Sequence, residues 1–429
     1  MTLILLFAAL VALIVLGFPV LLAIGITALG GIVLSENLTP ALLPQKIFAM
    51  LDSFSLLALP YFILAGELMA RGGLSKKLVQ FAETVVGHLR GGLGHASVVS
   101  SMIFAGVSGS STADTSAIGS ILIPSMKERG YKPGFAAALV AVAGTIGAII
   151  PPSMTMIVYG SMTGVSIGGL FLGGIVPGVL IGLGLMLVIY LYSLAPGFPE
   201  LRETSGRFNA GVALRSLRFV FLALLAPVII IGGILSGVFT ATEAGVVAAV
   251  YSFVVAMFVY KIIRWRDLPG LLVDTAVTSA MVVGIIGVAG ALGWLLSYLD
   301  FNDAVMRIVD SISGGRMVVF MSLLGMMLIL GMLLESLAVM IILVPVISAV
   351  AAKFGFDPIH VGILITMVTQ IGATTPPVAV LLFVATSIAG TTYDQTVKYC
   401  WAFILCEVIV LALVLFVPAT ATWIPRTFM

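Results

Sequence analysis

Long apolar stretches separated by short polar turns make up most of this chain. Residues 2–34 are also apolar, but Gly17-Phe18-Pro19 interrupts them, which predicts two short helices or one broken helix. The N-terminus lacks a basic flank and a small-residue cleavage site, so we interpret it as a first span. Because about 20 apolar residues suffice to cross a bilayer, the pattern predicts an all-α polytopic membrane protein. The other predicted full spans lie near residues 50–70, 168–194, 219–236, 241–260, 271–298 and 399–418.

One short phrase occurs twice inside apolar segments. Gly147-Ala148-Ile149-Ile150-Pro151-Pro152 lies within residues 134–165, and Gly372-Ala373-Thr374-Thr375-Pro376-Pro377 lies within residues 359–389. A double proline removes two backbone donors, and the freed carbonyls need protein, water or a ligand as partner in lipid. Interrupted helices at matching positions of two halves indicate a transporter binding site. The alternative is that both are ordinary proline kinks.

Two further segments have a polar centre between apolar arms. Residues 91–127 carry a polar tip from Ser108 to Asp114, and residues 317–350 carry Glu335-Ser336 at their middle. Neither arm of the first segment spans a bilayer comfortably, so it is predicted to be a re-entrant helical hairpin, and the second segment is predicted to form the matching hairpin of the second repeat. Residues 73–90 alternate charged and apolar positions in the manner of an amphipathic helix at the interface, and a similar arm is expected at 300–316.

The second half of the chain repeats the first. A shift of 225 residues aligns Gly147 with Gly372 and both proline pairs, and a shift of 221 places Asp114 opposite Glu335. If the first hairpin opens to the cytoplasm, the positive-inside bias is satisfied by all basic residues except Lys46, Arg307, Arg316, Lys353 and Arg426. The second hairpin then opens to the opposite face, which makes the repeats inverted.

This pattern predicts a division into moving and fixed parts. The two transport repeats would be 91–168 and 317–398, and the arm helices 73–90 and 300–316. Scaffold and connecting spans would comprise 1–72 and 169–299, with 399–429 as a C-terminal span.

Composition supports a membrane transporter and excludes several other classes. The chain is 61% hydrophobic and 9% charged, whereas soluble domains are about 25% charged. A net charge of +2 gives no reason to expect nucleic acid as a partner, while membrane lipids are expected. Cys400 and Cys406 suggest neither a disulfide framework nor a metal site. Neither a phosphate-binding loop nor a nucleophile elbow is present, so we expect no organic cofactor and no enzymatic activity.

Two carboxylates are predicted near the middle of the membrane, Asp114 and Glu335. A charge at this depth costs at least about 2.5–3.5 kcal/mol, and no lysine or arginine lies at either tip. A bound cation is a natural partner, because freed carbonyls and hydroxyls are hard oxygen ligands that suit Na⁺. The alternative is that each acid is protonated or caps a helix. The hydroxyls that could join the ligands belong to Ser108, Ser110, Thr374 and Thr375.

An anion could bind between the two predicted cation sites. The hairpin tips and the half-helices point backbone N–H groups and positive dipole ends toward the middle of the membrane. Hydroxyls would add to them, from Ser110, Ser111, Thr112 and Ser153 in the first repeat and from Ser336 and Thr374 in the second. The acids near predicted span ends or interfaces are interpreted as caps or helix–helix contacts; they are Glu67, Glu243, Asp274 and Glu407.

Several motifs together resemble a known family. Ser108-Gly109-Ser110 with Ala113-Asp114, Ile150-Pro151-Pro152-Ser153 and Thr375-Pro376-Pro377 are similar to the large permease subunit of tripartite ATP-independent periplasmic (TRAP) transporters. So are Asp52-Ser53-Phe54, Leu57 to Pro60 and Phe239 to Glu243, and the resemblance covers essentially the whole chain.

The resemblance implies an elevator-type secondary transporter in the bacterial inner membrane. It implies a small four-helix membrane subunit and a periplasmic substrate-binding protein as partners, and an organic anion as substrate, such as a C4-dicarboxylate, a related carboxylate or a sulfonate. Because the chain begins within its first span, the small subunit is expected on a separate chain. Phe301 stands where sialic-acid members carry an arginine, which argues against sialic acid.

Two or more sodium ions are implied by the same resemblance. One site maps onto Ser108, Ser110, Asp114, Gly147 and Ile150, and the other onto Glu335 with Gly372, Thr375 and Pro376. The favoured hypothesis is a Na⁺-driven, binding-protein-dependent importer. The alternatives are a proton-coupled anion carrier that works without a binding protein, and a channel or membrane scaffold.

Overall fold

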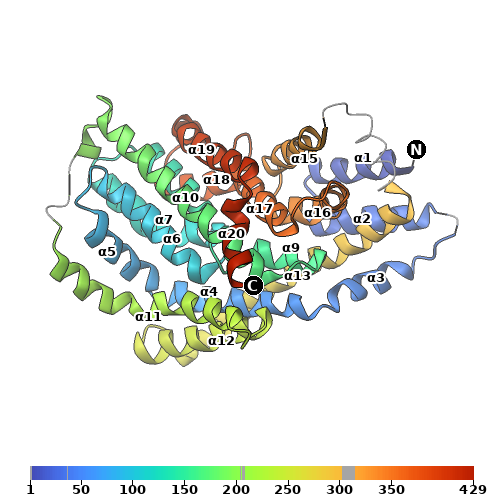
Figure 1. Cartoon of the computed structure of the whole chain (residues 1–429), viewed down its shortest axis with the longest axis horizontal. Coiled ribbons are helices and arrows are strands. Elements are labelled where there is room, and N and C mark those ends of the chain that lie inside the picture. The colour runs from blue at the N-terminus through green and yellow to red at the C-terminus, as the bar shows by residue number, and fades with distance from the viewer. Residues whose placement is uncertain (1, 36, 203, 205–207, 302–314) are drawn as a thin grey trace.

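The computed structural model of the chain describes all residues except 1, 36, 203, 205–207 and 302–314. Every regular element among the described residues is a helix, so the all-α prediction is confirmed (Figure 1). Within the same residues, six helical segments are long and apolar enough to cross a membrane. They are Phe54–Arg71, Ile167–Leu194, Ala241–Val259, Trp265–Tyr298, Ser336–Lys353 and Tyr393–Phe416.

The first polar-centred segment folds as a helical hairpin, as predicted. Its arms are α6 (Gly92–Ser108) and α7 (Ser111–Glu128), which pack side by side (Figure 1). The predicted broken helix follows as α8 (Pro133–Gly144), the short 3₁₀ turn η2 (Thr145–Ala148) and α9 (Met154–Thr163). The chain between η2 and α9 contains the first double proline.

The second half repeats this arrangement. A hairpin forms from α15 (Gly315–Gly331) and α16 (Ser336–Lys353), and the second broken helix from α17 (Pro358–Thr374) and α18 (Val380–Ala389). The interruption again contains the double proline. The predicted second arm helix falls largely on residues 302–314 and so lies outside the described residues.

The two repeats interlock. Helix α9, which follows the first interruption, packs against α16 of the second hairpin, and α18, which follows the second interruption, packs against α7 of the first hairpin. Each half-helix therefore buries an apolar side on the hairpin of the other repeat, so the two repeats share one core.

Helix α10 (Ile167–Leu194) shows that the hairpins open in opposite directions. Near its start, Gly169 lies against Ile359, just after the second hairpin. Just beyond its end, the Gly197 carbonyl accepts a hydrogen bond of 2.6 Å from Lys132, just after the first hairpin. The 28 residues of α10 extend about 42 Å at 1.5 Å per residue. The open ends of the two hairpins thus lie at opposite ends of this helix, and the repeats are inverted.

The remaining helices surround this core in two groups. Helices α1 and α2 pack together, and α13 packs against α2, α3 and α4, while α12 packs against α4 and α11. The amphipathic α5 packs against α6 and α11. Their bounds are α1 (Thr2–Val15), α2 (Val20–Val33), α3 (Leu42–Leu51), α4 (Ala58–Arg71), α5 (Leu74–Val86), α11 (Ala210–Leu235), α12 (Ala241–Val254) and α13 (Leu268–Tyr298).

Three boundaries differ from those predicted. The span predicted near residues 50–70 begins later, because α3 ends at Leu51 with Asp52 as its C-cap and a 3₁₀ turn at Phe54–Leu57 leads into α4. Helix α11 begins at Ala210, before the span predicted near residues 219–236, because the Asn209 side chain caps it, and Arg215 and Arg218 lie on the helix. The last span, α19 (Tyr393–Phe416), is followed by a separate helix, α20 (Ala419–Phe428).

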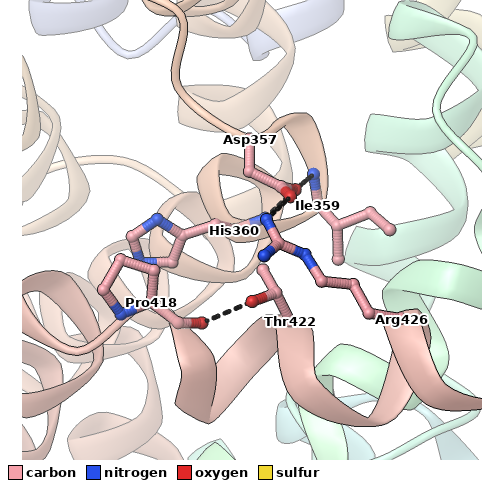
Figure 2. Close-up of polar contacts among 6 residues, drawn as sticks. All are labelled: Asp357, Ile359, His360, Pro418, Thr422 and Arg426. Atoms are coloured by element: carbon pink, nitrogen blue, oxygen red, sulfur yellow. Dashed lines mark hydrogen bonds and ion pairs between the residues drawn. The ribbon is translucent and has the colours of Figure 1, made fainter.

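Helix α20 is fastened to the start of α17. The Asp357 carboxylate accepts a hydrogen bond of 3.0 Å from Arg426, and its other oxygen caps α17 through the Ile359 N–H at 2.9 Å (Figure 2). Thr422 donates to the Pro418 carbonyl within the first turn of α20. Helix α20 also packs along α10, so the C-terminal segment closes one end of the core.

Candidate functional site

The tip of the first hairpin buries a carboxylate. Helix α6 ends at Ser108, Gly109 takes a left-handed conformation (φ 65°), and the Ser110 side chain caps α7. Asp114 lies in the first turn of α7 and is fully buried. One of its oxygens accepts a hydrogen bond from the Ser108 hydroxyl. The other, Oδ2, has no hydrogen-bond partner among the described residues.

The first interruption closes over this carboxylate. Gly147 lies so close that a Cβ atom there would be 2.2 Å from Oδ2 of Asp114. The Met154 N–H donates a hydrogen bond of 3.1 Å to the Gly109 carbonyl, which joins the interruption to the hairpin tip. Because Pro151 has no N–H, it cannot bond to the Gly147 carbonyl in the way a helical residue would. The structure therefore brings together Ser108, Asp114 and Gly147, three residues of the predicted first cation site.

The second hairpin meets the second interruption in a related way. The Val378 N–H donates a hydrogen bond of 3.3 Å to the Met332 carbonyl at the hairpin tip, as Met154 does to Gly109. Gly372, the counterpart of Gly147, packs on the backbone of Gly331. A Cβ atom at residue 372 would lie 2.8 Å from that backbone. In both repeats the glycine of the repeated phrase therefore permits close contact with the hairpin.

The two carboxylates, however, are placed differently. Glu335 is the N-cap of α16, and its carboxylate accepts hydrogen bonds from the N–H groups of Leu337 and Ala338 at 3.0 and 3.2 Å. Its side chain is exposed, whereas that of Asp114 is fully buried. The helix-capping alternative thus describes Glu335 in this structure, and its contact with a cation stays a prediction.

The other candidate ligands of the second site are engaged within α17. Thr375 donates a hydrogen bond of 2.6 Å to the Ile371 carbonyl. Thr375 is buried and Pro376 is half-buried. The Gly372 carbonyl accepts from the Thr375 N–H at 3.0 Å. The predicted ligands therefore cluster around one interruption, apart from Glu335 at the hairpin tip.

The first half-site fits a hard cation. It offers an unpartnered carboxylate oxygen and a hydroxyl in a buried position. None of the ion pairs between described residues includes Asp114. Within the described part of the chain, no cluster of three histidine, cysteine or acidic side chains could hold a metal. Oxygen donors of this kind suit Na⁺ rather than a transition metal.

The predicted anion-binding hydroxyls have varied surroundings. Ser110 is half-buried, Ser111 is buried, and Thr112 is exposed. Ser153 is fully buried, donates a bond of 2.5 Å to the Ala148 carbonyl and caps α9, so it braces the interruption. Ser336 donates to the Thr369 carbonyl at 3.2 Å.

One buried acid lies deeper in the membrane than predicted. Glu407 makes the expected contacts between helices, but it lies well inside α19 rather than near a span end and is fully buried. The hydroxyl of Thr145 lies 2.5 Å from its Oε1, and the hydroxyl of Thr374 lies 3.5 Å from its Oε2. Glu407 is the one charged residue between Trp401 and Phe416 of α19, and this was a usable signal because such residues are rare inside membranes.

Comparison with known proteins agrees with this architecture. Residues 7–420 match the family model described as the tripartite ATP-independent periplasmic transporter, DctM component. The chain belongs to this family. The predicted resemblance to TRAP large permeases is therefore confirmed, and the chain is a large permease of a multi-pass membrane transporter family.

Several proteins named as TRAP permeases are similar over most of the chain. The C4-dicarboxylate TRAP transporter large permease protein of Pseudomonas aeruginosa is 38% identical, over 89% of this chain and 88% of the relative. The sialic acid TRAP transporter large permease protein of Vibrio cholerae is 33% identical, over 96% of both. The isethionate TRAP transporter permease protein of Oleidesulfovibrio alaskensis is 37% identical over 94% of this chain, which spans 63% of that relative's length.

A solved structure shares the fold of this TRAP permease at low sequence identity. The YdaH transporter of Alcanivorax borkumensis, described as having an unusual topology, superposes with a TM-score of 0.63. The match covers 90% of this chain and 88% of that one at 13% identity. This likeness concerns the fold alone.

Proposed function

We propose that this TRAP permease is the large membrane subunit of a Na⁺-driven importer of a small organic anion. The buried Asp114 carboxylate carries the proposal, because one oxygen lacks a partner among the described residues and faces Gly147. A bound Na⁺ would neutralise this charge and fill the space beside the interruption. The second interruption, at Gly372–Pro376 with Glu335 nearby, would hold a second ion.

The family and the relatives support a proposal for the substrate and partners. Similar permeases are named for C4-dicarboxylate, sialic acid and isethionate, which are all organic anions. A carboxylate or sulfonate would bind between the hairpin tips, where half-helix dipoles and bound cations offset the missing basic residues. A periplasmic binding protein would deliver it, and a small membrane subunit would complete the complex in the bacterial inner membrane.

We further propose that transport follows an elevator mechanism. The interlocked repeats share one core, so they would move as a unit against the α1–α4 and α11–α13 helices. Helix α10 packs against α6, α17 and α19, which would place it with the moving part rather than with the scaffold to which residues 169–299 were assigned.

Reconstitution with the binding protein and small subunit in proteoliposomes tests the sodium assignment. We expect uptake to require an inward Na⁺ gradient and Asp114→Asn, which removes the charge and retains the side-chain volume, to abolish it. Asp394→Asn is the matched control, because Asp394 is exposed at the start of α19. Uptake that persists without Na⁺ would refute the proposal. A pH gradient that drives uptake alone would instead support proton coupling, and non-saturating flux would indicate a channel.

A further inference from the structure

Glu407 occupies the interior of the core. It lies on α19, whose Gln395 end touches Gly134 at the open end of the first hairpin. Near the other end, the Val414 carbonyl is bonded to His360 at 2.8 Å, beyond the open end of the second hairpin. At 1.5 Å per residue, Glu407 is about 18 Å from Gln395 and about 10 Å from Val414 along the axis. The residue is fully buried, so its carboxylate lies deep between the two repeats.

This carboxylate contacts both broken helices at once. Its Oε1 lies 2.5 Å from the Thr145 hydroxyl, and Thr145 begins the 3₁₀ turn that carries Gly147 over Asp114. Its Oε2 lies 3.5 Å from the Thr374 hydroxyl, the last residue of α17 before the second double proline. One side chain of α19 therefore connects the two interruptions.

Each of the two threonine hydroxyls has two possible acceptors, a backbone carbonyl of its own helix and the Glu407 side chain. The Thr145 hydroxyl also lies 2.7 Å from the Val142 carbonyl, and the Thr374 hydroxyl lies 3.0 Å from the Ile371 carbonyl. A hydroxyl has one proton to donate. With a carboxylate at residue 407, that proton can be shared across helices. With an apolar residue there, both threonines bond only to their own helices and the connection is lost.

The Glu407 carboxyl group forms no ion pair with another described residue that would explain its burial. None of the ion pairs between described residues includes it. A buried carboxylate is costly, and a connection between two functional interruptions gives a physical reason for its presence. The turn that begins at Thr145 also carries Gly147, which lies on Asp114, so Glu407 is placed where it contacts a residue next to each interruption.

We propose that Glu407 is a positioning residue that couples the two broken helices, so that a cation bound at one interruption raises the affinity at the other. This inference rests on the proposed Na⁺ sites. It predicts positive cooperativity in the wild-type complex, seen as a Hill coefficient above 1 for Na⁺ activation. Glu407 itself would touch neither cation.

Two substitutions of Glu407 distinguish its hydrogen bonds to the threonines from its carboxyl group as such. Glu407→Ala removes both contacts, and loss of an ordinary hydrogen bond corresponds to up to about a tenfold change in an equilibrium constant. We expect the half-saturating Na⁺ concentration to rise about tenfold and the Hill coefficient to fall to about 1. Glu407→Gln can still accept from one threonine and donate to the other, so it should keep the cooperativity. Val410→Ala, a buried apolar position one turn along α19, is the control for lost packing.

The Na⁺ titration is read in two ways, as uptake by the reconstituted complex and as thermal stabilisation of the purified complex. A Glu407→Ala protein with the wild-type Hill coefficient overturns the inference, and so does a Glu407→Gln protein as impaired as Glu407→Ala. If Glu407→Ala does not fold, Thr145→Val removes one contact, and wild-type cooperativity in that variant overturns it too.

Failure of the proposed function is recognised separately. A wild-type complex that shows no response to Na⁺ in either measurement refutes the sodium assignment. A wild-type complex that responds to Na⁺ with a Hill coefficient of 1 leaves that assignment standing and overturns the coupling through Glu407.

Discussion

Replacing Gly147 by alanine probes the contact between the first interruption and Asp114. The new Cβ would lie 2.2 Å from Oδ2, 2.6 Å from Cγ and 3.2 Å from Cβ of Asp114. Non-bonded heavy atoms prefer separations of about 3.5–4.0 Å, so the overlap exceeds about 1 Å. Asp114 is fully buried, so it can move only by giving up its bond with Ser108.

The magnitude follows from these two effects. A hydrogen bond to a charged group contributes about 1.5–3 kcal/mol, and overpacking of a close-packed site costs about 1–3 kcal/mol. A combined loss of about 3 kcal/mol would weaken Na⁺ binding on the order of 100-fold, at 1.4 kcal/mol for each factor of ten. The reference is the same substitution at Gly30, where nothing lies within 4 Å of the added Cβ.

The assay is a Na⁺ titration of the thermal unfolding midpoint of the purified protein, repeated for uptake in proteoliposomes. Gly147→Ala should show almost no Na⁺-dependent stabilisation, while Gly30→Ala should keep the wild-type titration. Alanine at residue 30 should also gain about 0.5–1 kcal/mol of helix stability, because glycine is unfavourable inside helices. A Gly147→Ala protein with a wild-type Na⁺ titration would refute the placement of the cation beside Asp114.

Two other predictions concern capping and the C-terminal helix. Glu335→Ser retains an N-cap oxygen, so the free energy of unfolding of the variant should change by less than about 1 kcal/mol, while its Na⁺ affinity should fall. Unaltered Na⁺ affinity would show that Glu335 acts only as a helix cap. Burial tends to raise the pKa of Asp357, but bonds from Arg426 and the His360 and Ile359 N–H groups outweigh it, and the pKa is lowered. Its stabilising contribution is therefore present above the unfolded pKa near 3.9 and lost as pH falls through the lower folded value. Because Arg426 is exposed, Asp357→Asn should lower the free energy of unfolding by up to about 1 kcal/mol and speed amide hydrogen exchange in α20 about fivefold at neutral pH. Unaltered exchange would contradict the role of Asp357 in fastening α20.

Much of the fold was predictable because a membrane chain must satisfy its backbone hydrogen bonds within each segment. The hairpins, the broken helices and α10 follow from apolar length, polar tips and double prolines, which act locally. Helix α3 and the early start of α11 were missed because their polar residues resemble loops, although Asn209 is a recognisable N-cap. Helix α20 contains Pro425, and its contact with Asp357 is not visible in the sequence.

The candidate site was predicted more completely in the first repeat than in the second. The contact between Asp114 and Gly147 was predictable because a carboxylate in an apolar segment and a glycine in a repeated phrase can both be recognised in the sequence. The alignment that pairs Asp114 with Glu335 could not show that Glu335 turns toward its own helix instead. The role of Glu407 depends on three segments meeting in space, so only the packed structure revealed it.

The interlocking of the repeats has a consequence for the history of the fold. Helix α9 is covered by α16, and α18 is covered by α7, so each repeat supplies what the other lacks. A half-length ancestor would have had this apolar face uncovered in its own chain. A second copy inserted upside down in the membrane is the partner that could have covered it. Duplication and fusion would then have joined two oppositely oriented monomers of a dimer into one chain.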